Sequence, residues 1–214
     1  MALRMKIFEK LGVRQATDPE DDYSHYEVGV EFTRQGRHAE AESEFKKALQ
    51  TGEREAEAAL KLGLLYEYLG RPQAAIPLFL RAIKANPDFT EAYSATGLAY
   101  DRAGDFLKAV RMHLKAIRLR PDDVELRMNL GLAYFNVGSY PEAIRAYQQA
   151  LLIQPENVAA HYALGLVCLD LDDQQLASEE LKVIKDLGDS AMATKLADEI
   201  DRQSLSRSRS PKSS

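Results

Sequence analysis

Residues 56–89, AEAALKLGLLYEYLGRPQAAIPLFLRAIKANPDF, contain the pattern that decides the fold. Gly63 in this stretch has counterparts at steps of 34 residues along the chain, and four other positions of the stretch recur at the same step. The five series are Gly29, Gly63, Gly97, Gly131 and Gly165; Gly36, Gly70, Gly104 and Gly138; Ala41, Ala75, Ala109, Ala143 and Ala177; Phe32, Tyr66, Tyr100 and Tyr134; and Pro87, Pro121 and Pro155. Agreement among the five series indicates a tandem repeat.

Each repeat has the spacing of two helices. In residues 90–123, Tyr93, Gly97 and Tyr100 lie on one face of a first helix, because their separations match the helical period. Gly97 removes a side chain where a second helix approaches closely, and Gly104 ends the first helix in a left-handed turn. The sequence therefore predicts an all-α fold, an α-solenoid of five antiparallel helix pairs. The predicted pairs are 22–55, 56–89, 90–123, 124–157 and 158–191.

The C-terminal end of the chain departs from the repeat. The fifth repeat has Asp172 in place of the turn glycine and Leu181 in place of an aromatic residue, as expected of a terminal unit. Residues 190–202 then place apolar side chains such as Leu196 on one side, which predicts an amphipathic C-terminal capping helix. Residues 203–214 are rich in serine and arginine, and we expect them to form a disordered tail.

Residues 1–21 form a separate segment ahead of the repeats. Its apolar residues gather on one side of a short amphipathic helix, and four basic residues supply positive charge. These residues are Leu3, Ile7, Phe8 and Leu11, with Arg4, Lys6, Lys10 and Arg14. Such a segment can cover the exposed side of the first repeat, or it can dock on an anionic membrane surface or a partner. The sequence leaves these interpretations open.

A Leu-Gly-x-x-Tyr element, an Ala-x-x-x-Phe element and a closing proline make up the repeat motif. In the second repeat they are Leu62, Gly63, Tyr66, Ala75, Phe79, Ala82 and Pro87. This motif resembles that of the tetratricopeptide repeat (TPR) family. The resemblance implies a right-handed superhelix whose first helices line a concave groove for a protein segment. It does not extend to members that clamp a chaperone's C-terminal carboxylate, because Tyr26 and Glu91 stand where those members have lysines.

A second stripe of residues follows the first helices on the side that the resemblance assigns to the groove. The stripe is apolar and contains Tyr26, Val30, Leu60, Leu64, Leu98, Met128, Leu132, Phe135, Tyr162 and Leu166. Around it lies an acidic rim of Glu57, Glu67, Glu91, Asp101 and Glu125. We expect the groove to take an amphipathic helix or an extended segment whose Lys or Arg residues face this rim.

Two alternatives compete with this groove hypothesis. Adjacent first helices touch along the same face, so about half of the stripe residues at the fifth and ninth positions of the repeats can belong to the core between repeats. Carboxylates in first turns, such as those of Glu57, Glu91 and Glu125, also favour the helix dipole without any partner.

Composition limits the remaining function classes. A formal net charge of -5 disfavours nucleic acid as a partner. Cys168 is the only cysteine, so it forms no intrachain disulfide, which points to a reducing compartment, the cytoplasm. No apolar run approaches the roughly 18 residues of a transmembrane span. His25 and His161 are too far apart to share a metal, and no phosphate-binding loop or nucleophile motif occurs. We expect no cofactor, no metal and no catalytic residue.

The sequence therefore predicts a non-catalytic protein–protein interaction scaffold or adaptor. Two alternatives stay open. One is a self-assembling structural scaffold, associated with a membrane through residues 1–14. The other is a regulatory subunit that acts in trans on an enzyme.

Overall fold

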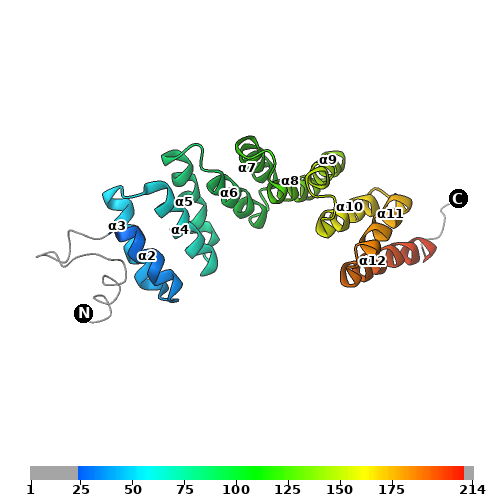
Figure 1. Cartoon of the computed structure of the whole chain (residues 1–214), viewed down its shortest axis with the longest axis horizontal. Coiled ribbons are helices and arrows are strands. Elements are labelled where there is room, and N and C mark those ends of the chain that lie inside the picture. Colours follow the sequence, from blue (N-terminus) through cyan, green and yellow to red (C-terminus); the bar gives the residue numbers. More distant parts are fainter. Residues whose placement is uncertain (1–23, 210–214) are drawn as a thin grey trace, which may run out of the picture. The chain divides into compact units, whose positions relative to one another are not determined.

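The computed structural model describes residues 24–209, and every regular element in this range is an α-helix (Figure 1). The helices are α2 (His25–Arg34), α3 (His38–Thr51), α4 (Glu55–Tyr68), α5 (Pro72–Ala85), α6 (Thr90–Arg102), α7 (Phe106–Leu119), α8 (Val124–Val137), α9 (Tyr140–Ile153), α10 (Val158–Asp170), α11 (Gln174–Asp186) and α12 (Ser190–Arg209). Helices α2 to α11 form five pairs, each with the 34-residue period of the sequence. The all-α prediction is confirmed, whereas the segment expected at residues 1–21 lies outside the described residues.

The chain divides into two compact units, one ending at Ala99 and the other beginning at Tyr100, so the boundary lies within α6. In unit 1, Phe45 and Phe79 are buried between the helices of their repeats. In unit 2, Tyr147 has the same place in the fourth repeat. Within each unit, successive helix pairs bury apolar surface against the next pair, because one pair is too small to do so alone.

Glycine in the middle of the first helix allows a close approach of the second helix in the first, second and fourth repeats, as predicted. A Cβ atom added to Gly29 would lie 2.8 Å from the Phe45 ring, and one added to Gly131 would lie 2.5 Å from the Tyr147 ring. The Phe79 ring stands in the same way against Gly63. These distances are too short for a real side chain, so the recurring glycine is required by packing.

The turn inside each helix pair contains a left-handed residue. Gly36, Gly70, Gly104 and Gly138 have φ angles between 72° and 82°. The prediction that these glycines end the first helices is therefore confirmed. The fifth repeat makes the same turn with Asp172, whose φ is 72°. Aspartate is one of the few other residues that adopts this conformation at low cost.

Helix α12 follows the fifth repeat and packs on both α10 and α11. Its Leu196 is fully buried and stands 2.8 Å from the position of a Cβ on Gly165. Leu196 thus fills the place that Phe45, Phe79 and Tyr147 have in their own repeats, where the fifth repeat lacks an aromatic residue.

The helix also continues beyond the predicted capping segment. Residues 203–209, which we assigned to a disordered tail, are helical in the structure, so that boundary was wrong. Two hydrogen bonds anchor the beginning of this extension through polar residues, which the apolar pattern does not reveal. The Gln203 side chain donates to the Leu169 carbonyl at 2.6 Å, and the Gln174 side chain donates to the Ser204 hydroxyl at 3.1 Å. Residues 210–214 of the tail lie outside the described range.

Candidate functional site

Unit 1 has a cavity between its first helices α2 and α4, with a volume of about 590 Å³. Its lining consists of Val30, Thr33, Arg34, Gly36, His38, Phe45, Lys61, Leu64, Leu65 and Tyr68. Leu64 and Tyr68 expose 40% and 75% of their surface. They are four residues apart on α4 and therefore face the same way. A guest side chain that enters this cavity can contact both.

The predicted groove residues of unit 1 separate into two groups. Val30 and Leu64 line the cavity. Tyr26 and Leu60 expose only 7% and 6% of their surface and belong to the hydrophobic core. Their burial agrees with the alternative that part of the stripe packs between repeats. Leu98 is half-buried and lies outside this lining. The part of the stripe that a partner can reach is therefore smaller than the sequence pattern suggests.

The charged side chains in the lining of the unit 1 cavity are basic. They are Arg34 from α2 and Lys61 from α4. Arg34 also forms an ion pair with Glu31 on its own helix. The His38 ring stands 4.9 Å from the Tyr68 ring and supports this exposed tyrosine at the mouth of the cavity. The cavity thus combines apolar and aromatic surface with cations.

Unit 2 has a smaller cavity, of about 340 Å³, on the corresponding helices. It is lined by Phe135, Leu166, Leu169, Asp170, Glu199, Arg202 and Gln203. Phe135 and Leu166 are predicted groove residues, but the last three lining residues belong to α12, so the capping helix forms one wall. Of the other predicted residues, Met128 and Tyr162 are half-buried, and Leu132 exposes 45% outside this lining.

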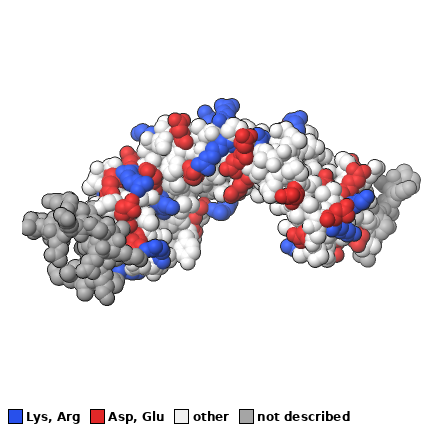
Figure 2. All heavy atoms as spheres, in the orientation of Figure 1, with Lys and Arg blue, Asp and Glu red and all other residues white. Residues whose placement is uncertain are grey.

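The five carboxylates expected to form an acidic rim line neither of the two cavities. Glu57 pairs with Arg54 at 3.3 Å, and Asp101 lies 2.9 Å from the Nε2 atom of buried His113. The remaining three are Glu67, which is half-buried, and the exposed Glu91 and Glu125. Acidic and basic side chains are interspersed on the visible face of each unit in Figure 2, with no continuous acidic band.

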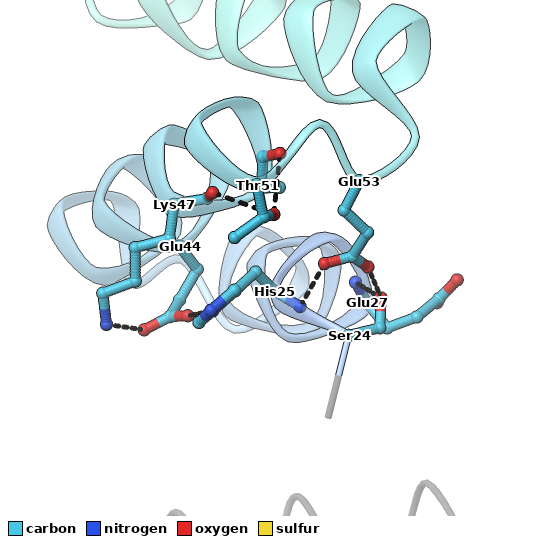
Figure 3. A network of polar contacts seen from close by, with 8 residues as sticks. Ser24, His25, Glu27, Glu44, Lys47, Thr51 and Glu53 are labelled. Atoms are coloured by element: carbon cyan, nitrogen blue, oxygen red, sulfur yellow. Dashed lines mark hydrogen bonds and ion pairs between the residues drawn. The ribbon is translucent and has the colours of Figure 1, made fainter. Parts of the chain in front are cut away.

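Two histidine–glutamate pairs join the helices of the first and fifth repeats. His25 Nδ1 lies 2.7 Å from Glu44 Oε2 (Figure 3), and His161 Nδ1 lies 2.6 Å from Glu180 Oε2. Both pairs occupy the same repeat positions, and Glu44, which also pairs with Lys47, exposes only 5%. The sequence contained a signal for them, because only the two repeats with this histidine have the glutamate. These pairs connect helices within a repeat and lie outside both cavity linings.

The single cysteine is buried against α11. Burial raises the pKa of the Cys168 thiol to about 11, and the nearby carboxylates of Asp173 and Glu180 act in the same direction. The thiol is therefore protonated at neutral pH, as expected of a small core residue. Within residues 24–209, no cluster of His, Cys, Asp and Glu side chains has the size needed to hold a metal ion. None of the described helices is long and apolar enough to cross a bilayer.

Sequence comparison agrees with this helix-pair architecture. A model described as tetratricopeptide repeat matches residues 26–88, 60–124 and 94–152, and a second model, described as TPR repeat, matches residues 137–172. The chain belongs to the tetratricopeptide repeat family. No curated protein sequence matches it.

Solved TPR structures share the fold of the chain. A crystal structure of MamA has a TM-score of 0.67 and 25% identity, with 82% of this chain and 97% of that chain covered. The MamA 41-end structure from Desulfovibrio magneticus RS-1 has a TM-score of 0.72 and 23% identity, with 78% and 94% covered. The fold of this TPR protein is thus an all-helical solenoid, the architecture of a protein-interaction scaffold.

Proposed function

We propose that this TPR protein is a non-catalytic scaffold that holds a helical or extended segment of another protein in the unit 1 cavity. The observation that carries the proposal is the pair Leu64 and Tyr68, which stay exposed on a concave surface although the helices around them are packed. Exposed apolar side chains that gather in a cavity of this size are typical of binding sites. A guest that covers them gains stability by removing apolar surface from water.

The charge of the lining specifies the guest further. Arg34 and Lys61 favour a segment with Asp or Glu beside its apolar anchor, because opposite charges steer association and suppress wrong partners. The sequence alone favoured a basic segment, on the basis of carboxylates that line neither cavity. For unit 1 the structure supports the opposite sign.

A reducing compartment, the cytoplasm, remains part of this proposal. It rests on Cys168, which is the only cysteine and is buried as a free thiol. The scaffold role also agrees with the burial of His113 and Cys168, two residues of types that often take part in catalysis.

A peptide display experiment tests the proposal. Full-length protein is used to select from a random peptide library, and the affinity of the selected peptides is measured by fluorescence anisotropy. We expect peptides with an aromatic or aliphatic anchor next to acidic residues. Leu64→Glu should weaken their binding at least about tenfold, since a buried charge replaces an apolar contact.

Leu132→Glu is the matched control, because Leu132 has the same repeat position in unit 2 and a similar exposure of 45%. This variant should bind the peptides as the wild type does. Equal losses in both variants, or selected peptides that bind Leu64→Glu with unchanged affinity, would remove the unit 1 cavity as the site.

A further inference from the structure

The second helix of the last repeat differs from its four counterparts at two exposed positions. Leu176 and Val183 of α11 expose 45% and 36% of their surface. In repeats one to four, the position of Leu176 is occupied by Glu40, Ala74, Lys108 and Glu142. The position of Val183 is occupied by Lys47, Arg81, Lys115 and Gln149. The repeat architecture therefore does not require apolar side chains at these positions.

Apart from Ala74, the earlier residues at these positions are polar, and several of them make polar contacts. Glu40 pairs with Arg37 at 2.7 Å, and Arg81 donates to the Leu49 carbonyl at 2.9 Å. Leucine and valine cannot make such contacts. Their exposed surface contributes to stability only if another molecule or segment covers it.

The two residues belong to a longer apolar row. Leu187 caps the C-terminal end of α11 and exposes 41% of its surface. It follows Val183 by four residues, and Val183 follows Leu176 by seven. Side chains at these separations lie along one side of a helix. We call Leu176, Val183 and Leu187 the α11 stripe.

A fourth exposed apolar residue is placed beside the α11 stripe by analogy with unit 1. There, Gln50 of α3 lines a cavity of about 430 Å³ together with Ala74 and Arg81 of α5. The corresponding residue of α9 is Leu152, which exposes 74%. Unit 2 therefore has an exposed apolar residue at the position where unit 1 has the polar Gln50.

The α11 stripe is bordered by carboxylates. Glu179 and Asp186 follow Leu176 and Val183 by three residues each, so both lie on the same side of the row, and both are exposed. Lys182 is exposed on this side as well, but the helical period places it farther from the row than the two carboxylates. Lys185 points to the opposite side of the helix, at about 180° from the stripe by the helical period. An apolar row with an acidic border fits an amphipathic segment that carries lysine or arginine beside its apolar face.

We infer that the α11 stripe binds residues 3–14 of a second copy of this chain. That segment has apolar residues at helical spacing and four basic residues, and its charge is complementary to the carboxylates at the stripe. Each copy carries one segment and one stripe, so the contact is heterologous and links copies into closed rings or open chains. This inference concerns a different surface from the unit 1 cavity and does not depend on the proposed function.

Complementation between two full-length variants tests the inference. The stripe variant carries Leu176→Glu and Val183→Gln, which are the residues of the fourth repeat at these positions and are therefore compatible with the fold. The segment variant carries Lys6→Glu and Lys10→Glu. Sedimentation velocity over a concentration series should show association of the wild type and at least about tenfold weaker association of each variant alone.

An equimolar mixture of the two variants should form a dimer and nothing larger. The intact segment of the stripe variant can then bind the intact stripe of the segment variant. The altered stripe and the altered segment cannot bind each other, so no further copy is added. Leu107→Glu is the control, because Leu107 exposes 69% elsewhere in unit 2 and should not affect association. A wild type that stays monomeric, a stripe variant that associates normally, or a mixture that stays monomeric would each overturn the inference.

Discussion

Units 1 and 2 use the same repeat positions for different purposes. In unit 1, Leu64 borders a cavity between repeat helices, and Tyr68 beside it exposes 75% of its surface. In unit 2, Leu166 has the position of Leu64, but α12 supplies part of the cavity wall there. In unit 2 this surface thus packs against the last helix, whereas in unit 1 it stays exposed, where we propose that it holds a guest. Repeat position alone therefore does not determine which surface can bind a partner.

The largest expected effect tests the role of α12 in unit 2. Leu196→Ala should lower the free energy of unfolding by about 2–5 kcal/mol, because it leaves a cavity beside Gly165. Urea denaturation followed by circular dichroism measures the change. Leu205→Ala on the same helix is the control, since Leu205 exposes 57% and should cost less than about 0.5 kcal/mol. Equal losses would mean that α12 does not cap the fifth repeat in this way.

A smaller effect compares the two histidine–glutamate pairs. Glu44→Ala should cost about 1–3 kcal/mol, because it removes the buried carboxylate that joins the His25 ring of α2 to α3. Glu180→Ala should cost less, since the Glu180 side chain exposes 19% against 6% for Glu44. Thermal or urea unfolding of the two variants gives the comparison. A larger loss in unit 2 would contradict the burial difference between the pairs.

The smallest effect concerns the turns. Gly70→Ala in unit 1 should cost about 1 kcal/mol, because alanine is strained at the φ of 72° that this residue adopts. Asp172→Gly in unit 2 should raise stability by about 0.5 kcal/mol, since glycine adopts the same angle without strain. Chemical denaturation resolves both changes. A gain in stability for Gly70→Ala would mean that the turn does not need a left-handed residue.

The repeat made most of the fold predictable. One step of 34 residues identified the helix pairs, and the packing role of Gly29 and the turn role of Gly36 followed from their positions. The continuation of α12 beyond Arg202 did not follow, because the hydrogen bonds of Gln203 and Ser204 that anchor its beginning leave no trace in an apolar pattern.

The candidate site was only partly predictable for a related reason. Val30 and Leu64 were identified from their shared repeat position, but the burial of Tyr26 and Leu60 depends on the neighbouring helices. Tyr68 was missed, although its separation of four residues from Leu64 would have placed it on the same side of α4.

Methyl NMR of the full-length protein tests most directly whether unit 1 holds the binding site. The probe is an acidic, apolar peptide selected by display, titrated into protein with labelled leucine and valine methyl groups. The account predicts that the Val30 and Leu64 methyl signals shift, while those of Leu166 and Leu169 in the unit 2 cavity do not. Shifts at Leu166 and Leu169 with unchanged Val30 and Leu64 signals would contradict it.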